Sequence, residues 1–115
     1  MGSVWMYAPD SGYGAQQSIV GFTVEAADGV IGHVDRQQDQ PGMQHLVVDT
    51  GVWKFGRSVL IPAGAVTSID AVAQKVEVAV SREEIKAAPR FTTDSETADP
   101  VYLSEVGGYY LSLRS

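Results

Sequence analysis

The sequence lacks cysteine, is poor in basic residues and has no long hydrophobic run. With 0 cysteines in 115 residues no disulfide framework can form, which favours a cytoplasmic location. The 8 Lys and Arg residues are scattered among 14 Asp and Glu residues, and the formal net charge is -6. Because an acidic surface repels phosphate groups, we expect neither a nucleic-acid partner nor binding to anionic membrane surfaces. No run is apolar over the length that spans a bilayer, so we expect no direct membrane insertion.

What is present predicts one small β domain. Hydrophobic residues make up 44% of the chain and charged residues 19%, which is typical of a globular protein and not of a disordered one. Short runs of alternating apolar and polar residues separated by turn residues predict six strands. These are residues 19–25, 30–36, 44–50, 57–61, 66–70 and 75–80. Because closure removes exposed strand edges, we expect an all-β fold, a small six-stranded antiparallel barrel.

Local signals support this organisation. Asp28-Gly29 lies between two apolar runs and predicts a hairpin turn, whereas Gly32 lies inside a strand and indicates a bulge or a close backbone approach. Residues 46–48 are apolar at every position, so both faces of that strand should be covered. Ser81 followed three residues later by Glu84 predicts the capped start of a short helical turn after the last strand.

The two ends of the chain lie outside the predicted barrel. Residues 1–18 form an irregular arm. It is either a frayed terminus or a segment whose Trp5 and Tyr7 pack on the barrel or on a second copy. The barrel domain then covers residues 19–91. Residues 92–115 form an acidic linker and a packed tail, which is either a short helix or an irregular segment. Gly107-Gly108 would end such a helix.

Four polar residues offer one possible metal site. His33 and Asp35 alternate along one predicted strand, and His45 and Asp49 share a face of another. If those strands were neighbours, the four side chains could bind a metal ion, but their spacing is not diagnostic of one. The alternative is that they are ordinary polar residues of a strand surface. Our expectation is therefore no metal and no cofactor.

No pattern of residues predicts catalysis. No serine lies in a nucleophile elbow, and Gly12-Tyr13-Gly14 has neither the flanking strand and helix nor the lysine of a phosphate loop. We therefore expect no catalytic residue and no enzymatic activity. Trp53 and Phe55, which lie between two glycines, are more informative. They form either an anchor for a partner or a lid on the open end of the barrel.

Several of these residues together resemble a known family. They are Gly21, Asp28, Gly29, Ile31, Gly32, Val34, Leu46, Val47, Val48, Leu60, Ile61 and Pro62. On these residues, segment 19–91 resembles a PRC-barrel domain, a family named after the cytoplasmic domain of the photosynthetic reaction centre H subunit. The family also includes the C-terminal domain of the bacterial ribosome-maturation factor. Residues around Asp49, Trp53 and Pro89, and Tyr109-Tyr110 after the glycine pair, resemble the free-standing bacterial members.

The resemblance implies a six-stranded barrel that acts as a cytoplasmic adaptor, stress-associated in some members, with no catalytic residue common to the family. We therefore expect a non-catalytic protein-interaction module that associates as a homodimer. The expected partner-binding residues are Trp5, Tyr7, Trp53, Phe55, Tyr109 and Tyr110. A ligand- or metal-binding barrel and an accessory role in ribosome assembly are the two alternatives.

Overall fold

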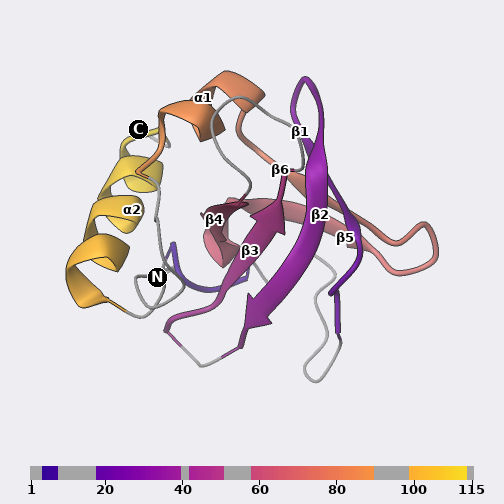
Figure 1. Ribbon diagram of the computed structural model, residues 1–115, viewed down its shortest axis with the longest axis horizontal. Helices are drawn as coiled ribbons and strands as arrows, with labels where there is room; N and C mark the ends of the chain where they lie inside the picture. Colours follow the sequence, from indigo (N-terminus) through magenta and orange to yellow (C-terminus); the bar gives the residue numbers. More distant parts are fainter. Residues whose placement is uncertain (1–3, 8–17, 40–41, 51–57, 90–98, 114–115) are drawn as a thin grey trace.

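The chain folds into six β-strands, a short 3-10 turn and two α-helices (Figure 1). The computed structural model describes residues 4–7, 18–39, 42–50, 58–89 and 99–113. The elements are β1 (Thr23–Ala26), β2 (Gly29–Gln38), β3 (His45–Asp49), β4 (Ser58–Pro62), η1 (Ala63–Ala65), β5 (Val66–Asp70), β6 (Lys75–Val78), α1 (Arg82–Ala87) and α2 (Pro100–Leu113). All six predicted strands are present. The first begins at Thr23, four residues later than predicted.

The strands form one mixed sheet in the order β4-β3-β2-β1-β6-β5. Neighbouring strands are antiparallel except β1 and β6, which run parallel with Val24 opposite Val76. The prediction of a purely antiparallel fold is therefore wrong. The antiparallel pairs all join strands consecutive in the sequence. The parallel pair joins the first strand to the last, and no local turn signals such a pairing.

The sheet is not closed into a barrel, which corrects the second part of the predicted architecture. Strands β4 and β5 lie at its two ends, and among the described residues no pairing of these strands joins the ends. Pro62 ends β4, and η1 then turns the chain before Val66 begins β5. Since proline has no backbone N–H, it favours a break in the ladder at this point. Strand β5 pairs with β6 instead.

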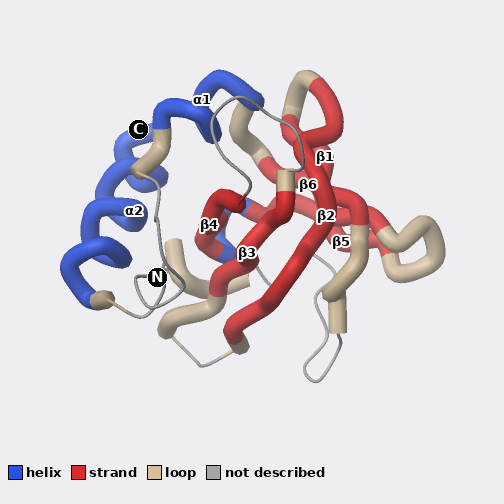
Figure 2. Tube along the Cα trace, viewed as in Figure 1, coloured by secondary structure: helices blue, strands red, loops and turns tan. Residues whose placement is uncertain are grey.

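The core lies between the curved sheet and the helices. Leu46, Val47 and Val48 of β3 are at most 3% exposed, which confirms that this strand is covered on both faces. Figure 2 shows both helices on one side of the strands, and α2 packs against β4. The helix buries Leu103 and Val106 in the same apolar cluster as Leu46 and Ile61. The C-terminal segment is thus part of the core.

The predicted β1–β2 hairpin is confirmed. Ala26 pairs with Gly29, and Ala27 and Asp28 form the turn between them. Gly32 in β2 lies so close to β3 that a Cβ atom there would overlap the carbonyl oxygen of Asp49. A glycine inside a strand therefore does mark a close backbone approach here, as its position predicted.

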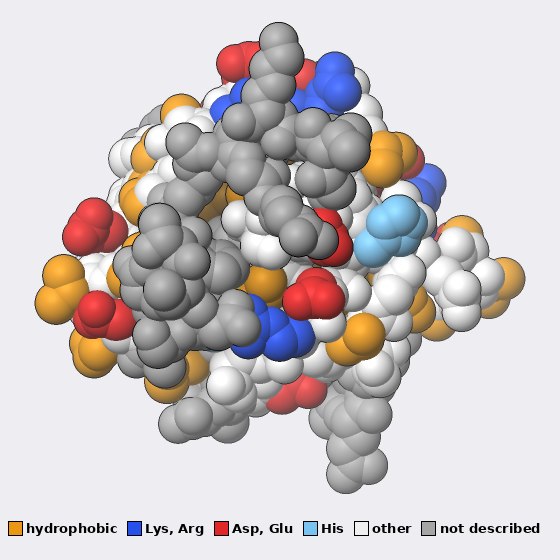
Figure 3. All heavy atoms as spheres, viewed as in Figure 1, with side chains coloured by type: hydrophobic (Ala, Val, Ile, Leu, Met, Phe, Trp, Pro, Cys, Tyr) orange, Lys and Arg blue, Asp and Glu red, His pale blue; other side chains and the backbone are white. Residues whose placement is uncertain are grey.

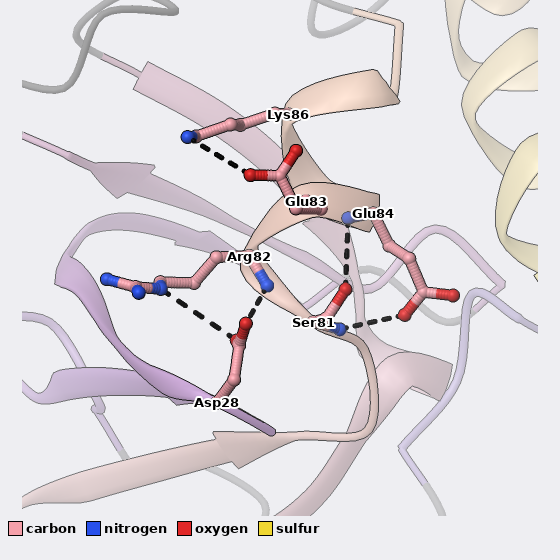
Figure 4. A network of polar contacts seen from close by, with 6 residues as sticks. All are labelled: Asp28, Ser81, Arg82, Glu83, Glu84 and Lys86. Atoms are coloured by element: carbon pink, nitrogen blue, oxygen red, sulfur yellow. Dashed lines mark hydrogen bonds and ion pairs between the residues drawn. The ribbon is translucent and has the colours of Figure 1, made fainter.

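The start of α1 is capped as predicted. The Ser81 hydroxyl accepts a hydrogen bond from the Glu84 N–H at 3.1 Å, and the Ser81 N–H donates to Glu84 Oε1 at 2.8 Å (Figure 4). Asp28 in the β1–β2 turn accepts a further bond from the Arg82 N–H at 2.9 Å. Its carboxylate also lies 3.8 Å from the Arg82 guanidinium. The hairpin turn is thereby fastened to the first turn of α1.

The C-terminal segment is a helix of 14 residues that continues through Gly107 and Gly108 to Leu113. The prediction that this glycine pair ends the helix is wrong. Of the two predicted forms of the tail, a helix or an irregular segment, the structure shows the helix. Tertiary packing on the buried face of α2 outweighs the low helix propensity of glycine. Within the described ranges, neither helix has the length and apolar character needed to cross a membrane.

Candidate functional site

Residues 4–7 of the N-terminal arm lie against the chain's own sheet and α2. The Val4 carbonyl accepts a hydrogen bond from the Gly64 N–H at 2.7 Å, and the Trp5 carbonyl accepts one from the Gln44 N–H at 2.9 Å. Val4 is 4% exposed and belongs to the core. Tyr7 is half-buried, and its N–H donates to Gln44 Oε1 at 3.3 Å. The structure therefore shows the arm packed on its own chain, which is one of the two predicted locations.

Trp5 is the anchor of this arm. Its ring meets the His45 ring edge-on, with 5.9 Å between the ring centroids and 79° between the ring planes. On another side it lies over Gly107 of α2, where a Cβ atom would come within 2.9 Å of Trp5 Nε1. Trp5 therefore joins the start of β3 to the middle of α2 and is half-buried in doing so.

The tyrosine pair of α2 has an internal role. Tyr110 is 2% exposed, so it is not the surface contact that the sequence suggested. Burial raises the pKa of its hydroxyl, with smaller contributions from Tyr109, Tyr102 and Glu84. The Tyr109 hydroxyl donates to the Glu84 carbonyl of α1 at 2.5 Å, and its ring packs edge-on against Tyr110. Burial, and then the charge of Glu84, raise the pKa of Tyr109.

Tyr102, which the predicted partner surface did not include, belongs to the same tyrosine cluster. Tyr102 is buried, and its hydroxyl donates to the Pro89 carbonyl just after α1 at 3.0 Å. The hydroxyls of Tyr102 and Tyr109 thus donate to two backbone carbonyls of the α1 region. A prediction of one continuous helix over this segment would have placed Tyr102 and Tyr109 on the same side of that helix. Trp53 and Phe55, the remaining predicted partner-binding residues, lie outside the described residues.

The four residues of the possible metal site are not brought together. His33 and Asp49 are register partners on β2 and β3, but His45 lies at the opposite end of β3, opposite Gln38. His45 is buried, and its Nδ1 lies 2.9 Å from the Met43 carbonyl. Burial lowers the pKa of His45, although the Met43 hydrogen bond opposes this. Asp35 lies 3.6 Å from Arg36. In the part of the chain that the structure describes, no three His, Cys, Asp or Glu side chains could hold a metal ion together.

The outer face of α2 carries apolar side chains that the described part of the chain leaves exposed. Val101 is 68% exposed and Leu111 is 51% exposed. Ser104 and Gly108 lie exposed between them, and a Cβ atom at Gly108 would meet no atom within 4 Å. Glu105 is the one charged residue of the helix. Figure 3 shows hydrophobic side chains projecting at the edge of the molecule that α2 forms, with acidic side chains between them.

This face was not predicted from the sequence. The signal was present as Val101, Ser104, Gly108 and Leu111 at steps of three, four and three residues, which share one face of a helix. It could be recognised only if the helix was assumed to pass through the glycine pair. We refer to these four residues as the α2 stripe.

Comparison with known proteins gives a structural likeness to solved structures. No family model matches the chain, and no curated protein matches it. The fold is similar to that of a 16S ribosomal RNA processing protein, RimM, from Pseudomonas aeruginosa, with 24% sequence identity and a TM-score of 0.48. The similar region covers 66% of this chain and 47% of the RimM chain. This chain therefore spans about half the length of that protein.

Proposed function

We propose that this chain is a non-catalytic protein-interaction module that associates with a second copy of itself through the α2 stripe. The observation that carries the proposal is an exposed helix face with two large apolar side chains and no charge along its centre. Depletion of charge together with apolar contact area is typical of the centre of an interface. Isolated exposed apolar residues are common, but here they repeat on one helical face.

The order of residues in the stripe favours a second copy as the partner. It has a large apolar residue at each end, Val101 and Leu111, and a small residue at each inner position, Ser104 and Gly108. Both pairs are centred on Val106 in the sequence. A two-fold axis at that level would place Val101 against Leu111 of the second copy in an antiparallel helix pair. The small inner residues would let the two helix axes approach closely.

The expected dimer is weak. Burying the Val101 and Leu111 side chains contributes roughly 1.5–3 kcal/mol for each one. Much of this offsets the entropy lost on association. The net charge of -6 also makes two copies repel each other. We therefore expect a dissociation constant on the order of 10–100 μM.

Gly108→Glu tests this function by placing a charge at the centre of the stripe. The matched control is Val72→Glu, which adds the same charge at a 96% exposed position in the β5–β6 turn. Sedimentation equilibrium over a range of concentrations should show association for the unmodified chain and the control, and association at least tenfold weaker for Gly108→Glu. A monomer at every concentration of the unmodified chain, or equal association of both variants, would contradict the proposal.

We also propose that the domain is of the PRC-barrel type. Support comes from the glycines of the sequence resemblance, which occupy special backbone positions. Gly21 has φ 90° and Gly29 has φ 148°, and Gly32 makes the close approach to β3. A cytoplasmic, bacterial adaptor without enzymatic activity, stress-associated in some members, is what that assignment implies. The likeness to RimM has a TM-score below 0.5 and gives no weight to a role in ribosome assembly.

A further inference from the structure

The N-terminal arm lies in a groove built from three separate parts of the chain. Gly64 of η1, Gln44 with His45 at the start of β3, and Gly107 of α2 supply its contacts. We call these four residues the arm groove. The arm is bound as a peptide ligand would be, through backbone hydrogen bonds to Gly64 and Gln44 and through one aromatic anchor, Trp5.

Two glycines give the groove its shape. A Cβ atom at Gly64 would lie 2.6 Å from the Val4 carbonyl oxygen, and one at Gly107 would lie 2.9 Å from Trp5 Nε1. Any other residue at either position would have to displace the arm. Glycine is unfavourable inside a helix, so its presence at position 107 is accounted for by the arm that packs there.

The contacts also define what the groove recognises. Val4 and Trp5 are buried or half-buried, Met6 is 46% exposed, and Tyr7 is half-buried. The groove therefore fits an extended segment with a branched apolar residue, a tryptophan, any residue and an aromatic residue in that order. The arm of a second copy supplies this segment without any change of sequence.

We propose that the arm groove accepts residues 4–7 of a second copy, so that two chains exchange arms. The contacts would be the same within one chain and between two, and the protein concentration would decide the balance between the closed monomer and the exchanged dimer.

Residues 8–17 connect the arm to Ser18. Ten residues can span at most roughly 35 Å, and the longest extent of the molecule is 33 Å. A fully extended connection can therefore cross a distance as long as the molecule itself. The inference goes beyond the α2 stripe, whose exposed residues lie beside the buried Gly107 on the helix surface.

Complementation between two damaged chains tests the exchange. Trp5→Ala damages the arm and leaves the groove, whereas Gly107→Leu blocks the groove and leaves the arm. Both full-length chains also carry Gly108→Glu, which removes the proposed contact between α2 stripes. Each variant alone should be monomeric. Their mixture should form a one-to-one heterodimer, with a dissociation constant at least tenfold below that of either variant alone, because the intact arm finds its groove on the other chain.

A labelled peptide of residues 1–9 provides a second measurement that does not depend on the folding of Gly107→Leu. It should bind saturably to the Trp5→Ala, Gly108→Glu chain and at least tenfold more weakly to a chain whose own arm is intact. If the peptide does not bind and no heterodimer forms, the proposal is overturned. Peptide binding without a heterodimer also overturns arm exchange, since the connection would then fail to reach. Failure of Gly108→Glu to change association of the otherwise unmodified chain contradicts the α2 contact alone.

Discussion

Gly107 and Gly108 are neighbours in the sequence but lie on different faces of α2, about 100° apart around the helix axis. Gly107 is buried beneath Trp5, where an added Cβ atom would come within 2.9 Å of the indole nitrogen. Gly108 is exposed, and an added Cβ atom would meet nothing within 4 Å. Glycine therefore serves a different purpose at each position. At Gly107 it leaves space for the arm, and at Gly108, in our proposal, it lets a second helix approach closely.

Alanine at these two positions should have opposite effects on stability. Gly108→Ala should raise the free energy of unfolding by about 0.5–1 kcal/mol, because alanine is the better helix former and the space is open. Gly107→Ala should lower it, because Trp5 has to move and the helix gain does not compensate. Urea unfolding of both variants at low protein concentration measures this difference. A gain of stability for Gly107→Ala would contradict the packing of Trp5 against α2.

The elements differ in how far the sequence predicts them. The β1–β2 hairpin and the capped start of α1 were predicted because their signals, Asp28-Gly29 and Ser81 with Glu84, are local. Helix α2 was only partly predicted, because Trp5, which packs on Gly107 in the middle of the helix, lies at the other end of the chain. The surface position expected for Tyr110 differs from its buried position in the structure for the same reason: its burial depends on how α2 packs on the sheet.

The cap of α1 should matter more than its surface ion pair. Ser81→Ala should lower the free energy of unfolding by roughly 1 kcal/mol, because it removes the acceptor for the Glu84 N–H. Lys86→Ala is the control. It removes an exposed contact with Glu83 at 3.5 Å, which should contribute only about 0.3–0.5 kcal/mol. Thermal unfolding measures both, and equal losses would contradict the capping account.

At the scale of the whole molecule, the sequence predicts the number and order of strands but not how the sheet is assembled. The parallel pairing of β1 with β6 joins Thr23 to Lys75 across most of the chain. No turn residue determines that pairing. The open sheet and the position of α2 over β4 follow from the same long-range packing. The α2 stripe could therefore be located only in the folded chain.

The central claim is that two chains pair through antiparallel α2 stripes, and cysteine cross-linking tests it most directly. The chain contains 0 cysteines, so an introduced thiol reacts alone. A two-fold antiparallel pair places Ser104 opposite Gly108 of the second copy, at a separation that suits a disulfide. Mixed Ser104→Cys and Gly108→Cys chains should therefore form the mixed disulfide faster than either symmetric one, and faster than Val72→Cys chains cross-link. Equal rates for all of these pairs would contradict the account.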